Sequence, residues 1–368
     1  MSEPPTPTHR RKRSLSRRGV IGAAAAVAGG AAVTPAVFAA TDSGDTAADT
    51  SGTTPEKFPA TRTEAATGTG AATTSFATSY VGVRWSGAQD GAGIRFTDGE
   101  ASPGTWQTLD GGCATVDDGG TALIASGAAT AYEVKAPDGA TGVRSLAIDT
   151  TGGPDRTFKV PSEPTRVRGV RYLCRAAWGA DESKRYKDGN GNSPEKYYPL
   201  QSITVHHTAG PNADPDPAAT VRAIYEYHAV TLDWGDIGYH FLIDEAGTVY
   251  EGRYSGDDGI PAFDPDGNVV TAFHTAGFNS GNLGIALLGT LTEQGPTAAA
   301  KASLTRLIKV IARFKGLDPQ AKITYVNPVN GVTKDVTTVS GHRDWLQTEC
   351  PGQTMYDLLN EVRAAASR

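Results

Sequence analysis

The sequence predicts an α/β domain with a mixed central sheet and flanking helices, preceded by a small all-β domain. Residues 80–148 alternate apolar and polar side chains between turns rich in glycine and proline, which is typical of antiparallel strands. From residue 166 onward, short apolar runs of strand length are interleaved with longer segments of helical periodicity, which favours a sheet covered by helices. The 368 residues are enough for two domains with tails.

The first forty residues have the pattern of a signal peptide. A basic run at residues 10–13 and the pair Arg17 and Arg18 precede an alanine-rich apolar stretch over residues 19–33. That stretch is shorter than the roughly 20 residues that a membrane-spanning helix needs. The apolar stretch leads into small residues at Ala39 and Ala40, which suit a signal peptidase. We therefore expect residues 1–40 to be a twin-arginine signal peptide, and the mature chain to be exported without a membrane span.

The charge of the chain argues against nucleic acid as a partner. The whole sequence has a net charge of −6, and loss of residues 1–40 would leave 28 basic and 39 acidic residues. A protein that binds nucleic acid normally carries a basic face, so the sequence predicts no nucleic-acid partner. The sequence leaves the oligomeric state open.

Residues 41–74 are predicted to be a flexible linker, because threonine, alanine, glycine, serine and aspartate dominate and large apolar side chains are almost absent. A small β-rich domain is predicted over residues 75–160, with a last strand at residues 143–148. Nothing in that region has helical periodicity.

The α/β domain is predicted over residues 166–368. Strands are expected at residues 202–207 and 282–288, and a hairpin at residues 239–253. Asp216 and Pro217 have the types preferred at the start of a helix. Further helices are expected from the apolar positions at residues 304–314, ending at Gly316, and at residues 355–362.

The chain has three cysteines, Cys113, Cys174 and Cys350. An odd number in an exported protein leaves at least one cysteine unpaired, bonded to another chain or holding a metal. A disulfide between Cys113 and Cys174 would leave Cys350 free, but sequence does not supply the geometry that decides such a pairing.

His206, His342 and Cys350 are the candidate metal ligands. His206 lies at the carboxyl end of a predicted strand, where side chains of α/β sheets often meet a ligand. His342 lies in a Gly-His-Arg-Asp turn, eight residues before Cys350. Two imidazoles and one thiolate favour zinc, and three protein ligands leave a fourth position for water. Taken singly, a histidine at a strand end is more often a hydrogen-bonded residue, and a buried cysteine is usually a small apolar side chain.

Several segments resemble peptidoglycan recognition proteins and the related type 2 N-acetylmuramoyl-L-alanine amidases. They occur in the family's order at residues 175–180 (RAAWGA), 205–209 (VHHTA), 236–244 (DIGYHFLID), 282–289 (NLGIALLG) and 340–352 (SGHRDWLQTECPG). The resemblance covers roughly residues 166–368 and implies that fold for this region. It also implies zinc-dependent hydrolysis of the amide between N-acetylmuramic acid and L-alanine, with peptidoglycan or muropeptide as the partner and a secreted or cell-wall location.

The resemblance carries the zinc ligands onto His206, His342 and Cys350. It also implies catalytic roles for Tyr239, which would hydrogen-bond the bound water or the scissile carbonyl, and for Thr348, which would help to hold the oxyanion. It does not place a glutamate as general base, and the exposed position expected for Glu349 makes it a solvated carboxylate at a helix start.

Four further residues are predicted to contact substrate: His207, His274, Asn282 and Arg253. His207 points to the other strand face from His206, so we expect it in the groove or behind a metal ligand rather than on the metal itself. Structural roles are expected for two more histidines, His228 and His240.

Two other functions compete with the amidase. The domain could bind muropeptide without cutting it, or Cys350 and His342 could form a cysteine peptidase of the cell wall. Binding-only members of the family typically lack the cysteine, and neither alternative requires Tyr239 and Thr348.

Overall fold

The structure is a computed structural model that describes residues 52–97, 103–109, 119–163 and 165–368. The predicted signal peptide and Cys113 lie outside these residues. Cys174 is a free cysteine, and its pairing with Cys113, which the sequence left open, falls outside the described residues because of Cys113. Among the described residues, no helix is both long and apolar enough to cross a membrane.

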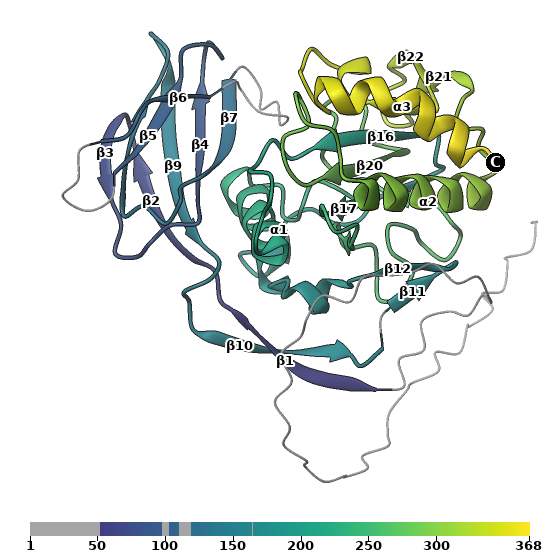
Figure 1. Cartoon of the computed structure of the whole chain (residues 1–368), viewed down its shortest axis with the longest axis horizontal. Coiled ribbons are helices and arrows are strands. Elements are labelled where there is room, and N and C mark those ends of the chain that lie inside the picture. The colour runs from purple at the N-terminus through teal and green to yellow at the C-terminus, as the bar shows by residue number, and fades with distance from the viewer. Residues whose placement is uncertain (1–51, 98–102, 110–118, 164) are drawn as a thin grey trace, which may run out of the picture. The chain divides into compact units, whose positions relative to one another are not determined.

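The β-rich part is a sandwich of two four-stranded antiparallel sheets (Figure 1). One sheet has the order β2-β9-β4-β7, with bounds Arg62–Thr67, Thr141–Asp149, Tyr80–Ser86 and Gly119–Ala125. The other has the order β3-β8-β5-β6, with bounds Gly70–Thr73, Ala131–Lys135, Gly93–Thr97 and Gln107–Thr108. Alternate apolar residues from both sheets, among them Val83, Ile94 and Val134, form one buried cluster. The period-two pattern of the sequence produces this two-sided core.

The predicted linker is wrong for residues 53–73, which form three strands. Strand β1 (Thr53–Pro59) pairs antiparallel with β10 (Asp155–Pro161), while β2 pairs with β9 and β3 pairs with β8. The side chains of β2 and β3 are mostly small or polar. This composition is tolerated because one face of each strand is exposed and the other is only half-buried. Their stability comes from backbone pairing and from contacts such as Arg62 with Asp149 at 2.5 Å, neither of which requires an apolar run. Residues 41–51 lie outside the described part.

The α/β part is built on a mixed five-stranded sheet with the order β18-β17-β20-β16-β23. In that order the strands span Val249–Glu251, Phe241–Ile243, Asn282–Leu287, Ser202–His207 and Val339–Gly341. Strand β16 runs parallel to both β20 and β23, and β17 and β18 form the predicted hairpin. The mixed sheet and its flanking helices confirm the predicted fold class.

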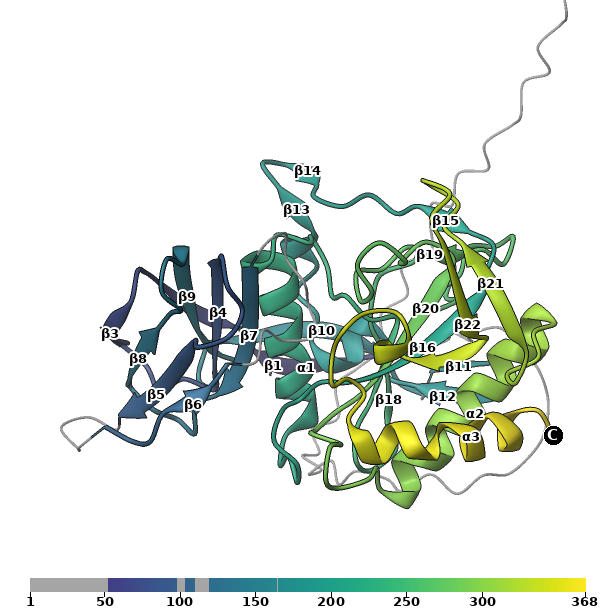
Figure 2. The same cartoon turned by 90° about the horizontal axis from the view of Figure 1, so that it is seen from above.

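Three helices cover the two faces of this sheet. Helices α2 (Ala298–Lys315) and α3 (Gln353–Ala366) lie side by side in Figures 1 and 2 and share a core with Val205 and Ile285. Helix α1 (Pro217–Glu226) packs against the opposite face, which includes Leu242 and Ala286. Successive residues of a strand point to opposite faces, so His206 shares the α1 face.

The predicted helix ends are confirmed. The Asp216 side chain accepts a hydrogen bond from Ala219 N, which caps α1, and Pro217 is the first residue of that helix. Gly316 ends α2 in the left-handed conformation at φ 65°, where a side chain would be strained.

Short elements complete the domain. The paired strands are β11 and β12 (Thr165–Val167, Val170–Tyr172), β13 and β14 (Tyr186–Lys187, Asn190–Gly191), β15 and β19 (Tyr197–Tyr198, Val269–Val270) and β21 and β22 (Lys322–Val326, Thr333–Thr337). The chain also has 3-10 helices at Arg175–Trp178, Glu182–Arg185 and His342–Asp344, and a π-helical turn at Tyr227–Thr231.

Candidate metal centre

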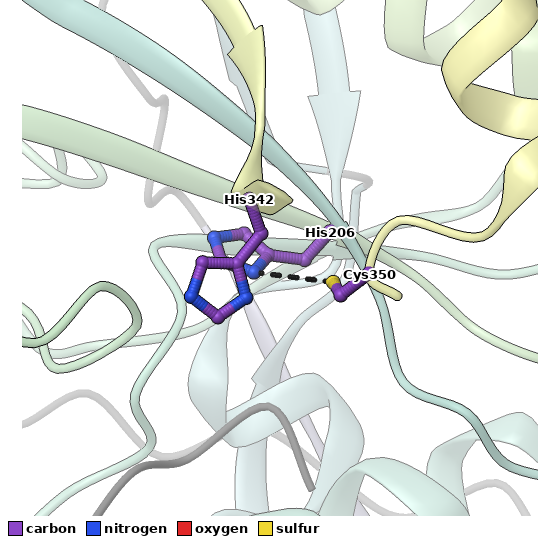
Figure 3. Close-up of side chains that lie close together, drawn as sticks. All are labelled: His206, His342 and Cys350. Carbon is purple, nitrogen blue, oxygen red and sulfur yellow. Dashed lines mark hydrogen bonds between the residues drawn. The ribbon is translucent and has the colours of Figure 1, made fainter. Parts of the chain in front are cut away.

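The three predicted metal ligands converge at the carboxyl ends of two neighbouring strands. His206 is the second-last residue of β16, and His342 directly follows β23. These strands pair in parallel with Val205 opposite Gly341, which places the two following histidines side by side with ring centroids 4.5 Å apart. Cys350 arrives from the loop before α3 (Figure 3). The candidate ligand atoms all lie within 4.8 Å of one another, which confirms the predicted convergence.

The thiol of Cys350 is held against β16. Its Sγ lies 3.6 Å from His206 Nδ1, the contact dashed in Figure 3, and it accepts a hydrogen bond from His207 N at 3.4 Å. The loop that carries it is fixed by hydrogen bonds from Arg343, whose backbone N donates to Cys350 O at 2.9 Å. Cys350 is only 1% exposed, so its thiol faces the two histidines rather than solvent.

The ligand set fits a zinc ion. Both ring nitrogens of His342 are buried and have no hydrogen-bond partner among the described residues. Leaving buried polar atoms without partners is costly, and a metal ion at the cluster would remove that cost for the coordinating nitrogen. Two imidazoles and one thiolate are ligands that zinc accepts in a tetrahedral site with one position open.

Burial keeps His206 in the form that binds metal. Desolvation, reinforced by neighbouring His342, holds the pKa of His206 well below its usual value. Desolvation also lowers the pKa of His274, the histidine beside His206. Neutral imidazole is the ligating form, so the environment disfavours the protonated state that would compete with a metal.

Tyr239 borders the centre from the segment before β17. Its ring lies 5.3 Å from the ring of His206 and 5.5 Å from that of His228. The backbone around it is fixed, because Gly238 N donates to His228 Nδ1 at 3.0 Å and Arg253 N donates to Tyr239 O at 2.8 Å. The buried His228 therefore has the structural role that was expected.

Thr348 is half-buried on the loop that carries Cys350. Its hydroxyl accepts a hydrogen bond from Cys350 N at 3.3 Å and still has its own proton to donate. The neighbouring Glu349 has a side chain that is 86% exposed, as expected for a solvated carboxylate.

Two of the predicted substrate contacts are enclosed within the domain. Asn282 has no exposed surface, and its side chain accepts from the Thr204 hydroxyl at 2.9 Å and donates to Phe278 O at 3.1 Å. His207 is 4% exposed and its Nδ1 accepts from Leu291 N at 3.1 Å. Both side chains satisfy groups of the fold, and contact of either with substrate stays a prediction.

The other two predicted contacts are also buried. Arg253 is 2% exposed, donates to the Ser193 hydroxyl at 2.8 Å and lies 4.5 Å from the centre of the Phe273 ring. It packs beneath the surface, and its contact with substrate stays a prediction. His274 is buried and has a ring nitrogen 3.0 Å from His206 Nε2, so it contacts a predicted ligand, and its contact with substrate stays a prediction. His240 has the expected structural role, since its ring nitrogens reach Val270 O and Gly284 N.

A buried ion pair that the sequence reasoning missed fixes the segment leading to Tyr239. Arg175 Nη1 donates to Asp236 Oδ1 at 3.0 Å, and both residues are almost fully buried. The Asp236 carboxylate also accepts from the backbone of Ile237 and Tyr254. Both residues lie in motifs visible in the sequence, at 175–180 and 236–244. Their pairing could not be predicted, because no sequence pattern indicates a contact between residues so far apart in the chain.

Glu251 makes the stability of this region depend on pH. Burial raises the pKa of its carboxyl to about 7, although the nearby Arg175 opposes the shift. A raised pKa in the folded state means that the stability linked to protonated Glu251 is complete below its unfolded pKa and is lost as pH rises through about 7. We expect Glu251→Gln to raise the melting temperature at pH 8 and to change it little at pH 4.5.

Melting curves of both proteins between pH 4.5 and pH 8 measure this effect. Glu293→Gln, at an exposed carboxyl, is the matched control and should follow the wild type throughout. Parallel curves for Glu251→Gln and wild type would contradict the expected linkage.

Comparison with known proteins agrees with the geometry of the centre. A family model described as N-acetylmuramoyl-L-alanine amidase matches residues 196–353, a range that includes all three candidate ligands. The chain is 32% identical over 190 residues to the human N-acetylmuramoyl-L-alanine amidase, covering 50% of this chain and 27% of that protein. It therefore spans about a quarter of that relative's length.

A shorter relative is matched over most of its length. The chain is 31% identical over 199 residues to peptidoglycan-recognition protein SC2 of Drosophila melanogaster, covering 54% of this chain and 87% of that protein. Among solved structures, the Drosophila peptidoglycan recognition protein SD is similar with 27% identity and a TM-score of 0.38, covering 52% of this chain and 94% of that one. The near-complete match to the SC2 protein and the match to the amidase family model establish that this chain belongs to the family of peptidoglycan recognition proteins and type 2 amidases.

Proposed function

We propose that this protein is an exported zinc-dependent N-acetylmuramoyl-L-alanine amidase, which hydrolyses the amide between N-acetylmuramic acid and L-alanine in bacterial peptidoglycan. The observation that carries the proposal is the meeting of His206, His342 and Cys350, with ligand atoms within 4.8 Å of one another. Family membership makes peptidoglycan the substrate or ligand class to test first. The complete ligand set favours hydrolysis over binding alone.

The residues of the centre have distinct tasks in this proposal. His206, His342 and Cys350 would hold the zinc ion. When bound, zinc would supply a Lewis acid for the scissile carbonyl and the means to activate water at neutral pH. The burial of all three side chains keeps bulk water away from the ligand atoms and strengthens their electrostatic effect.

Tyr239 and Thr348 would stabilise the charge that develops on the carbonyl oxygen. Both carry hydroxyl protons, and both are held in place before substrate arrives, Tyr239 by its packing against His206 and Thr348 by its bond to the Cys350 backbone. Preorganised donors of this kind act mainly on the transition state, because the charge they meet is larger there than in the substrate.

One observation favours a second function, a cysteine peptidase. Cys350 Sγ lies 3.6 Å from His206 Nδ1, a separation from which an imidazole can activate a thiol. The sequence-based version of this alternative paired Cys350 with His342, whereas in the structure the thiol contacts His206. Removal of metal separates the two functions, because a thiol-dependent peptidase does not need zinc.

The decisive experiment is mass spectrometry of purified peptidoglycan after incubation with the protein. We expect stem peptides with a free L-alanine amino terminus, their loss after treatment with a chelator, and their return when zinc is added back. Cleavage that survives chelation but is blocked by a thiol-alkylating reagent would favour the peptidase. Binding to peptidoglycan without release of any peptide would favour the non-catalytic module and contradict the amidase.

A further inference from the structure

The metal centre has a second layer that fixes one of its ligands, formed by His274 and the backbone of β20. His274 Nε2 lies 3.1 Å from Asn282 O, and His274 Nδ1 lies 3.0 Å from His206 Nε2. On the other side of the same ring, His206 Nδ1 faces Cys350 Sγ at 3.6 Å (Figure 3). The four groups form a continuous line from a backbone carbonyl to the thiol.

The carbonyl at one end determines where the protons lie along this line. A carbonyl oxygen can only accept, so His274 Nε2 must carry the hydrogen that it shares with Asn282 O. In a neutral ring, His274 Nδ1 then has a lone pair, which accepts the Nε2 hydrogen of His206. His206 Nδ1 is left without a hydrogen and turned toward Cys350. Its lone pair is then free to bind a metal ion that Cys350 also holds.

The opposite tautomer of His206 is disfavoured by the same contacts. A hydrogen on Nδ1 would leave the Nε2 lone pair facing the lone pair of His274 at 3.0 Å. The Thr275 hydroxyl, 2.8 Å from His274 Nδ1, can donate to that nitrogen as well but cannot move the hydrogen away from Nε2. We propose that His274 is a positioning residue which, through Asn282 O, sets the tautomer and orientation of His206 for metal binding.

The fold supports this role by fixing the His274 ring. Gly284 of β20 lies against it, and a Cβ at that position would come within 2.6 Å of His274 Cγ. His274 N and Thr275 N both donate to the Asn279 side chain, which anchors the loop. A ligand held by such outer contacts keeps one orientation before the metal arrives, and losing them typically lowers metal affinity by about 10 to 100-fold.

The inference rests on the proposed function only in taking zinc as the metal, and the test uses zinc binding rather than turnover. Zinc dissociation constants of the full chain would be measured by competition with a chelating dye, for wild type, His274→Leu and His274→Gln. We expect about a 10 to 100-fold weaker affinity for His274→Leu. The glutamine variant should recover most of it, because its amide can accept from His206 and donate to Asn282 O.

A matched control tests whether any buried histidine replaced by leucine weakens zinc binding simply by destabilising the domain. His240 is also buried and bonds two backbone groups; its ring packs 5.6 Å from the His274 ring, but its ring nitrogens bond Val270 O and Gly284 N rather than His206, His342 or Cys350. His240→Leu should therefore lose stability without losing zinc affinity in its folded fraction. The absorption spectrum of the cobalt-substituted proteins provides a second readout, since a change in the His206 ligand alters the thiolate-to-cobalt bands.

The outcomes separate this inference from the proposed function. A His274→Leu variant that binds zinc within about twofold of the wild type would overturn the role of His274 and leave the amidase proposal standing. The same holds if His240→Leu weakens zinc as much as His274→Leu does. A wild-type chain that takes up no zinc would overturn both proposals.

Discussion

Replacement of Cys350 by serine is expected to lower the rate of stem-peptide release by more than about a hundredfold, because losing an outer contact alone costs up to that factor and Cys350 is proposed as a direct ligand. A serine hydroxyl is a much weaker zinc ligand than a thiolate, so the zinc content of the purified variant should fall in parallel. Product formation followed by mass spectrometry and metal content by elemental analysis measure the two effects.

The second described thiol provides the control for this variant. Cys174 is free and half-buried, and it lies outside the ligand cluster. Cys174→Ser should retain zinc and activity near wild-type levels. If Cys350→Ser instead kept both, neither the metal centre nor the cysteine peptidase could account for cleavage. If Cys350→Ser lost cleavage but still bound muropeptide, Cys350 would be needed for metal binding and cleavage but not for substrate recognition.

Replacement of Tyr239 by phenylalanine is expected to lower kcat by about a hundred to a thousandfold, the cost of removing one preorganised oxyanion donor. The ring that packs 5.3 Å from His206 is kept, so zinc content and folding should not change. A loss confined to kcat, with KM little changed, would indicate that the hydroxyl acts mainly in the transition state. Steady-state rates on a soluble muropeptide provide the measurement.

Tyr225→Phe is the matched control for this second variant. Tyr225 is also a buried tyrosine of the same apolar cluster, but its hydroxyl donates to Asp181 O on the other side of α1. The Tyr225→Phe variant should have a lower free energy of unfolding but an unchanged kcat. A Tyr239→Phe variant with wild-type kcat would remove Tyr239 from the catalytic residues while leaving the zinc ligands in place.

The ligands could be predicted because their chemistry and their strand positions are both visible in the chain. His206 ends a strand of alternating pattern, and His342 and Cys350 share a turn with a recognisable order of residues. What the sequence lacked was the register that pairs Val205 with Gly341 and so brings the two histidines together.

Solvent access was the property that sequence reasoning judged least well. Asn282, Arg253 and His207 lie at or near strand ends, where polar side chains often meet a ligand, yet all three are buried. A side chain's exposure depends on which distant segments pack over it, and a linear pattern does not contain that information. The strands at residues 53–73 were missed for a related reason, since their partners β8, β9 and β10 lie far along the chain.

Periodicity, local capping and side-chain chemistry are visible in the chain, so the sequence predicted the fold class, the helix ends at Asp216 and Gly316, and the three candidate ligands. The tertiary structure alone decided which ring nitrogen of His206 faces Cys350, that His274 is bonded behind it, and that Arg175 pairs with Asp236. These features depend on contacts between residues far apart in the chain, and their geometry exists only after the strands have assembled into the sheet.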